Sequence, residues 1–215
     1  PSTIGAALPA APSISIARLA AFGEPVAAAK LTMLWLQAFD FQSGSRTPYR
    51  DLDYEALIGW LQRIVELDPQ GQYPLMSAAR LYAEVPDAAK QRAIIDWIYR
   101  EFLRDPNRRW PWAAHAAIIA KHQLHDLQLA RTIAIALQQQ TTDPRAPVWV
   151  RTMELFVLED LNELEAAKVL IGGILSSGMP LSEHEAQLLE RRLRQLEARQ
   201  HDAADVPGSP SAVKK

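Results

Sequence analysis

The sequence of 215 residues contains no cysteine. Disulfide bridges, thiolate zinc sites, iron–sulfur clusters and cysteine nucleophiles are therefore excluded. It also lacks an excess of basic residues, because 23 Lys and Arg stand against 25 Asp and Glu. Proteins that bind nucleic acids through phosphate contacts carry clustered Lys and Arg. Nucleic acid is therefore not an expected partner.

Long apolar runs are missing as well. Charged or glutamine residues interrupt each apolar stretch before it reaches the roughly 18 residues that span a bilayer, so no transmembrane segment is expected in this chain. Even so, 48% of the residues are hydrophobic and 22% are charged, which is typical of a protein with a packed core. No Gly-x-Ser-x-Gly or His-Glu-x-x-His motif occurs, so we expect neither a cofactor nor an enzyme.

The two ends of the chain differ in composition from its middle. Residues 1–13 are rich in Ala, Pro and Ser and carry no charge, which predicts a disordered linker. Residues 200–215 contain Pro207, Gly208 and Pro210 without apolar periodicity, which predicts a disordered tail. The Ala/Pro-rich start and the lack of cysteine favour an exported protein, or one tethered to a membrane through a removed N-terminal segment; a cytoplasmic location is the alternative.

Proline recurs at nearly constant intervals in the middle of the chain. Three Asp-Pro pairs and a fourth proline are spaced by 37, 38 and 36 residues: Pro69, Pro106, Pro144 and Pro180. Proline cannot continue a helix but fits its first turn, and the residue before it is pushed out of the helical region. The spacing therefore predicts a repeated helix–break–helix unit.

Apolar residues recur at helical spacing in two segments between successive breaks. The expected units are approximately 25–67, 72–105, 110–142 and 147–178, followed by a capping helix over 182–199. Asp87, Asp126 and Asn162 are candidate N-caps of the second helix in three units. Ser182 and Glu185 have the spacing of a capping box at the start of the last helix. Residues 14–199 are therefore predicted to form one α-helical repeat domain.

Two short segments resemble the turn and second helix of the tetratricopeptide repeat: Glu159–Ala167 (EDLNELEAA) and Gln123–Ala130 (QLHDLQLA). The resemblance implies an all-α fold, a short right-handed superhelix of antiparallel helix pairs closed by a C-terminal capping helix. The period of about 37 departs from the family's roughly 34 residues, and the family's Trp, Gly and Tyr positions are not regularly filled. Other right-handed arrays of helical pairs therefore fit the sequence equally well.

Stacked helix pairs of this kind leave a concave surface made mainly by the first helix of each pair, and such surfaces hold peptides or partner helices. The resemblance therefore implies a non-enzymatic scaffold whose partner is a protein or peptide. The predicted partner-binding residues are Tyr73, Arg80, Trp110, His115 and Arg151. The arginines are expected to pair with acidic groups or a terminal carboxylate, and the aromatic residues to provide apolar contacts.

Two alternatives for the function stay open. In the first, the chain is a structural subunit of a larger or membrane-tethered complex, pairing through an apolar helix over 25–40 that contains Leu31, Leu34, Trp35 and Ala38. Otherwise it is a metal-binding or enzymatic protein that uses His115, His122 and His125. His125 and Asp126 fall in a predicted turn, where they serve as a polar linker and an N-cap, and no second ligand cluster supports a metal site.

The segment Arg108-Arg109-Trp110-Pro111-Trp112 is unusual in composition. Arg beside Trp forms cation–π pairs or binds carboxylate and phosphate groups. One interpretation is that these residues begin a helix, with the tryptophans wedged between helices and the arginines in solvent. The other is that they belong to a binding surface.

Overall fold

The computed structural model describes residues 8–38, 51–160, 164–176 and 181–204. It forms helices α1 (Ile14–Ala20), α2 (Pro25–Ala38), α3 (Tyr54–Leu67), α4 (Tyr73–Arg80), η3 (Tyr82–Glu84, a 3₁₀ turn), α5 (Ala88–Arg104), α6 (Pro106–His122), α7 (Leu127–Gln140), α8 (Val148–Arg151), α9 (Met153–Asp160), α10 (Leu164–Ser176) and α11 (Glu183–Ala204). No strand occurs in this described part of the chain. The prediction of an all-α fold is confirmed.

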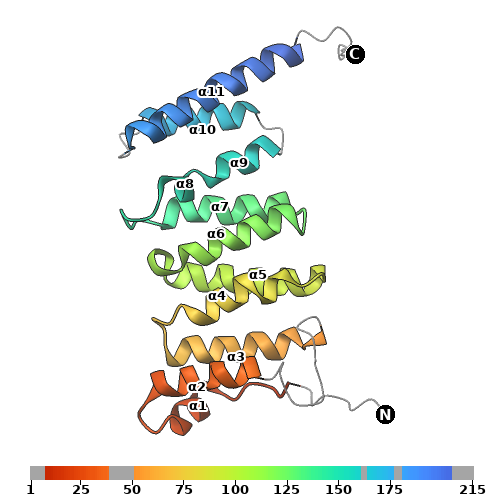
Figure 1. The fold of residues 1–215 in the computed structure, drawn as a ribbon, viewed down its shortest axis with the longest axis vertical. Helices are drawn as coiled ribbons and strands as arrows, with labels where there is room; N and C mark the ends of the chain where they lie inside the picture. Colours follow the sequence, from red (N-terminus) through yellow and green to blue (C-terminus); the bar gives the residue numbers. More distant parts are fainter. Residues whose placement is uncertain (1–7, 39–50, 161–163, 177–180, 205–215) are drawn as a thin grey trace, which may run out of the picture.

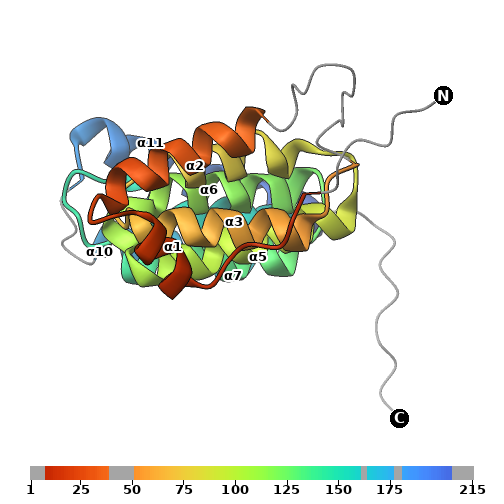
Figure 2. The ribbon, with the colours of Figure 1, turned by 90° about the horizontal axis from the view of Figure 1, so that it is seen from below.

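The helices stack in chain order along the long axis of the molecule (Figure 1). Seen along that axis, α2 and α6 lie on one side of the stack and α3, α5 and α7 on the other (Figure 2). We call the helices α2, α4, α6, α8 and α9 the first layer, and α3, α5, α7 and α10 the second layer. The C-terminal helix α11 packs mainly against α10.

The predicted apolar positions form the core between the layers. Leu57 and Leu61 of α3, Ile94 and Ile98 of α5 and Ile133 of α7 are completely buried. They belong to a hydrophobic cluster that extends from the N-terminal segment to α9. A second, smaller cluster joins α9, α10 and α11. Burial of each large aliphatic side chain stabilises the fold by about 1.5–3 kcal/mol.

Several predicted helix caps are present. Asp87 accepts hydrogen bonds from the backbone N–H groups of Ala89 and Lys90, and Asp126 accepts one from Leu129. At the start of α11 the Ser182 and Glu185 side chains bond each other's backbone N–H groups, as a capping box requires. Asn162 lies outside the described residues.

Three expected helices differ from the observed ones. The helix expected from residue 110 begins at Pro106, because Asp105 ends α5 and also precedes α6. Pro106 then occupies the first helical position, where a missing N–H costs nothing. In the unit expected over 72–105 the first helix divides into α4 and η3, and in the unit expected over 147–178 the first helix divides at Thr152 into α8 and α9.

The expected linker over residues 1–13 is ordered in its described part, residues 8–13. Leu8 is buried, and the carbonyl oxygens of Pro9 and Pro12 accept hydrogen bonds from Trp60 Nε1 and Arg63 Nε, both at 2.7 Å. These bonds tie the extended segment to α3. At the other end α11 continues to Ala204, so the first residues of the expected tail are helical. Residues 1–7 and 205–215 lie outside the described part.

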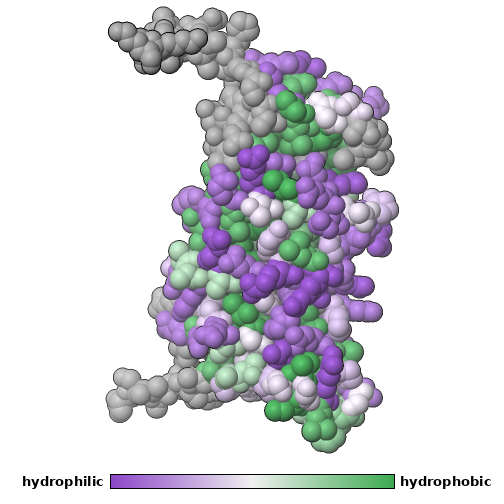
Figure 3. Space-filling view, turned by 180° about the vertical axis from the view of Figure 1, so that it is seen from behind, coloured by the Kyte–Doolittle hydropathy of each residue, from purple (hydrophilic) through white to green (hydrophobic). Residues whose placement is uncertain are grey.

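Helices α1 and α2 form an apolar end of the stack. Exposure reaches 80% for Leu19, 93% for Phe22 and 67% for Leu31. Viewed from behind, the molecule shows many hydrophobic residues at its lower end, where these helices lie (Figure 3). No single described helix is long and apolar enough to cross a membrane. Helices α1 and α2 are long and apolar enough only when taken together, and they are bent by 105° relative to each other.

Candidate interaction surface

Three apolar grooves open along the first layer. The first, which we call the α2–α4 groove, has a volume of about 440 Å³ and lies where α2 meets the start of α4. Met33 and Leu34 of α2 face Ile64 of α3 and Tyr73 across it, and Lys30 and Asp68 provide charged groups at its edge. Tyr73 is 46% exposed, and its hydroxyl accepts a hydrogen bond of 2.6 Å from Gln37 Nε2.

The two other grooves share a wall. The α6–α9 groove, of about 280 Å³, lies between Ile118 and Lys121 of α6 and the α8–α9 segment. The α9–α11 groove, of about 430 Å³, lies between that segment and α11. Trp149 and Phe156 line both grooves. These two side chains therefore stand on the ridge between two apolar depressions.

The walls of these two grooves expose large apolar side chains. Trp149 and Phe156 are each 47% exposed, Ile118 is 45% exposed and Leu188 of α11 is 53% exposed. Trp149 also packs edge-on against Trp110 of α6, with ring centroids 6.1 Å apart. Exposed apolar clusters of this kind are typical of surfaces that bind another molecule. Aromatic residues in such clusters supply much of the binding energy at protein interfaces.

The five predicted partner-binding residues lie in different parts of this region. Tyr73 lines the α2–α4 groove, and Trp110 is half-buried against Trp149. Arg80 is exposed at the end of α4. His115 is half-buried, with Nε2 3.6 Å from Glu84 Oε1. Arg151 ends α8; hydrogen bonds from Ser182 chiefly lower the pKa of the Glu185 carboxyl, and the Arg151 charge adds a smaller effect in the same direction.

Trp149, Phe156 and Leu188 were not among the predicted binding residues. Trp149 and Phe156 are seven residues apart, a spacing that shares a face in an unbroken helix, but the break at Thr152 places them in α8 and α9. No comparable signal existed for Leu188. Its part in the groove depends on the angle at which α11 meets α10, which is set by tertiary packing.

The three histidines of the alternative metal site have separate surroundings. His115 faces Glu84, His122 lines the α6–α9 groove, and His125 occupies the turn before α7 with a φ of 54°. The described residues contain no group of three or more His, Asp or Glu side chains arranged to hold a metal ion.

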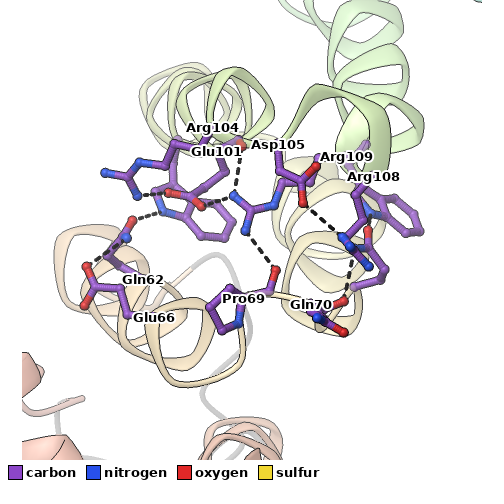
Figure 4. A network of polar contacts seen from close by, with 12 residues as sticks. Gln62, Glu66, Pro69, Gln70, Glu101, Arg104, Asp105, Arg108 and Arg109 are labelled. Carbon is purple, nitrogen blue, oxygen red and sulfur yellow. Dashed lines mark hydrogen bonds and ion pairs between the residues drawn. The ribbon is translucent and has the colours of Figure 1, made fainter. Parts of the chain in front are cut away.

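Arg109 differs from the expectation that both arginines of its segment lie in solvent. It is 3% exposed, and its Nη1 donates to Glu101 Oε2 at 2.5 Å while Nη2 donates to the carbonyl of Pro69 at 3.2 Å (Figure 4). Glu101 is buried as well and also pairs with Arg104. This buried ion pair joins α5, α6 and the turn after α3, so Arg109 has a structural role.

The tryptophans of the same segment occupy positions between helices, as expected. Trp110 packs on Trp149, and Trp112 Nε1 donates to Gln72 Oε1 at 2.8 Å. A cavity beside the Arg109 cluster is lined by three basic and three acidic side chains: Arg18, Arg104, Arg109, Glu66, Glu101 and Asp105. Because the charges balance, this cavity does not attract an anion and we assign no site to it.

The arrangement therefore provides apolar grooves with scattered charges at their edges, which suits the binding of side chains from another molecule. Comparison with models of protein families, with curated proteins and with solved structures finds no match to this chain.

Proposed function

We propose that this chain is a non-enzymatic interaction scaffold that binds a partner protein or peptide on its first layer. The observation that carries the proposal is that first-layer helices line three apolar grooves, with Tyr73, Trp149 and Phe156 about half exposed in them. Large aromatic side chains that are left half exposed gain free energy when a partner covers them.

The proposal includes the type of architecture. We infer a short right-handed superhelix of the tetratricopeptide kind, with the first layer on its concave side. Regular helix pairs, Asp-Pro turns at similar intervals and the capping box of α11 support it. The division of the fourth unit into α8 and α9 and the period of about 37 residues are departures from that family.

The test is capture of partners from a lysate of the source organism, with quantitative mass spectrometry. Tyr73→Ala combined with Trp149→Ala removes one anchor from each end of the first layer. We expect the captured partner to fall at least tenfold, or about 1.4 kcal/mol. Leu103→Ala is the matched control, because Leu103 is also 47% exposed but belongs to α5 in the second layer. Equal capture by wild type and the double variant, with unchanged circular dichroism, overturns the proposal.

A second candidate function is a structural subunit that pairs through its N-terminal end. It is favoured by the apolar exposure of α1 and α2 and by Phe22, which is 93% exposed in a left-handed backbone conformation (φ 48°). Non-glycine residues adopt this conformation at a cost. Light scattering tests this second function. If the function is correct, the wild-type chain self-associates and the Leu31→Glu, Leu34→Glu variant is monomeric. A monomeric wild-type chain counts against it.

A further inference from the structure

The α9–α11 groove lies between the α8–α9 segment and α11. Helix α11 packs mainly against α10, and its buried Leu189 and Leu196 join the small hydrophobic cluster of α9 and α10. The next side chain, Leu188, lies outside that cluster and is 53% exposed toward the groove. One wall of the groove is therefore an α11 face that α9 does not cover.

The opposite wall presents two aromatic side chains. Trp149 of α8 and Phe156 of α9 both line the groove, one on each side of the break at Thr152. Together with Leu188 they form three half-exposed apolar contacts around a groove of about 430 Å³. Amphipathic helices bind such grooves with apolar side chains at i, i+3 or i+4, and i+7.

The edge of the groove is basic. Arg191 and Arg192 of α11 line it, and Arg151 ends the helix that carries Trp149. Glu185 is the one acidic side chain among the described residues that line this groove, and its Oε2 is held by the Ser182 N–H and hydroxyl groups at 2.8 and 2.7 Å. An occupant with carboxylates beside its apolar face therefore complements the edge.

Residues 205–215 do not complement this edge. They carry Asp205 against Lys214 and Lys215, so their side chains are net basic. These residues at the groove would place like charges beside Arg191 and Arg192, which is unfavourable.

We propose that the α9–α11 groove binds an amphipathic helix of a partner protein that carries Asp or Glu beside its apolar face. The apolar side chains of that helix contact Trp149, Phe156 and Leu188, and its carboxylates pair with Arg191 and Arg192. The inference rests on the proposed scaffold function and specifies the chemistry of the partner. It assigns recognition to α11, which the sequence analysis treated only as a cap.

A defined peptide tests this directly. We would use a fluorescein-labelled amphipathic peptide of about five helical turns with leucines on one face and glutamates beside them, and measure anisotropy with the full chain. We expect saturable binding, at least about fivefold tighter than that of the same peptide with lysine for glutamate. A peptide of equal composition with shuffled spacing should not bind. Absence of saturable binding by the acidic peptide, or equal binding of the acidic and basic peptides, overturns the proposal.

Charge reversals locate the site. Arg191→Glu should weaken binding of the acidic peptide about fivefold and strengthen binding of the lysine peptide. Arg194→Glu is the control, because Arg194 is on the same helix, three residues away, and is not among the residues that line the groove. Equal effects of the two reversals overturn the proposal. Saturable binding of phosphatidylglycerol vesicles instead of the peptide, lost in Arg191→Glu, also overturns it.

The two proposals fail separately. If Tyr73→Ala with Trp149→Ala abolishes partner capture while Leu188→Ala and Arg191→Glu retain it, the scaffold function stands and the α9–α11 groove is not its site. If all these variants capture the same proteins as wild type and the acidic peptide still binds at the groove, the peptide site stands without the wider first-layer surface.

Discussion

Arg108 and Arg109 are neighbours in the chain and lie in opposite environments. The Arg108 side chain is 46% exposed and pairs with Asp105, whereas the Arg109 side chain is 4% exposed and pairs with Glu101, which is 1% exposed. A surface pair of this kind contributes little, because water competes for both charges. A buried pair has already lost its hydration, so removing one partner leaves the other charge without compensation.

Arg109→Ala should therefore lower the free energy of unfolding by about 3–5 kcal/mol, measured by urea denaturation followed by circular dichroism. Arg108→Ala, one residue away, should change it by less than about 0.5 kcal/mol. Adding Glu101→Gln to Arg109→Ala should recover part of the loss, because the buried charge is then removed. Similar small losses from both single substitutions would contradict the burial of this pair.

The position of Arg109 could have been predicted with a better helix start. Once α6 begins at Pro106, Arg109 shares one face with the buried alanines 113, 116 and 120, at the helical spacing of four, seven and eleven residues. Starting the helix at residue 110 left Arg109 outside the pattern. The identity of its partner could not be predicted, because Glu101 belongs to another helix and their contact depends on the angle between the two.

At the scale of single elements, the N-terminus of α11 shows how a local signal determines a helix boundary. The Glu185 carboxylate accepts hydrogen bonds from the backbone N–H and the hydroxyl of Ser182, and these bonds lower the pKa of Glu185 below its ordinary value of 4.5. The pair satisfies backbone groups that helix termini otherwise leave without partners. Because the two residues are only three positions apart in the sequence, this boundary was predictable.

The cap should lose its effect in acid. Since the folded-state pKa of Glu185 is lowered, its stabilisation is fully present above the unfolded value of about 4.5 and is lost as the pH falls through the lower folded value. We expect hydrogen-exchange protection factors of the first turns of α11 to fall below about pH 4.5. At neutral pH, Ser182→Ala should lower these protection factors by an amount equivalent to about 1 kcal/mol of local stability.

Glu185→Gln should remove this pH dependence, whereas Glu190→Gln should retain it. Glu190 is on the same helix but forms only an exposed pair with Arg194, at 4.0 Å. Equal pH dependence in Glu185→Gln and wild type would contradict the role of the carboxylate.

Helix interiors, caps and the breaks at the Asp-Pro pairs were predictable from the sequence, whereas the break between α4 and η3 and the break between α8 and α9 were not. The 3.6-residue periodicity placed α3, α5 and α7 within a few residues of their observed bounds, because each buries one regular stripe. The break between α4 and η3 has a tertiary component: Tyr54 Oη of α3 donates to the carbonyl of Tyr82 at 2.7 Å. A hydrogen bond between residues 28 positions apart cannot be predicted from the local sequence pattern around either residue.

For the whole molecule, the division of the core into two hydrophobic clusters determines how stability is distributed. The larger cluster connects the N-terminal segment to α9, and the smaller one connects α9, α10 and α11. In a stack where each unit contacts mainly its neighbours, stability is close to a sum of local terms. The position of Tyr73 on a first-layer helix was predictable from the repeat, whereas the α9–α11 groove depends on how the last unit packs.

Two matched substitutions should separate the clusters. Ile98 of α5 and Ile171 of α10 are both completely buried, the first in the larger cluster and the second in the smaller. Truncation of each to alanine should cost about 2–5 kcal/mol. Hydrogen exchange of the backbone amides is the measurement. In Ile171→Ala, the amides of α10 and α11 should lose protection while those of α3 and α5 keep theirs. In Ile98→Ala, the amides from α3 to α7 should lose protection.

Uniform loss of protection across the chain in both variants would instead show a single cooperative unit. The α9–α11 end would then have no independent freedom to open. If the local response is observed, the last unit can adjust the angle of α11 at low cost, because opening it disturbs only the smaller cluster. That freedom is what a groove between α9 and α11 needs in order to fit helices of different width.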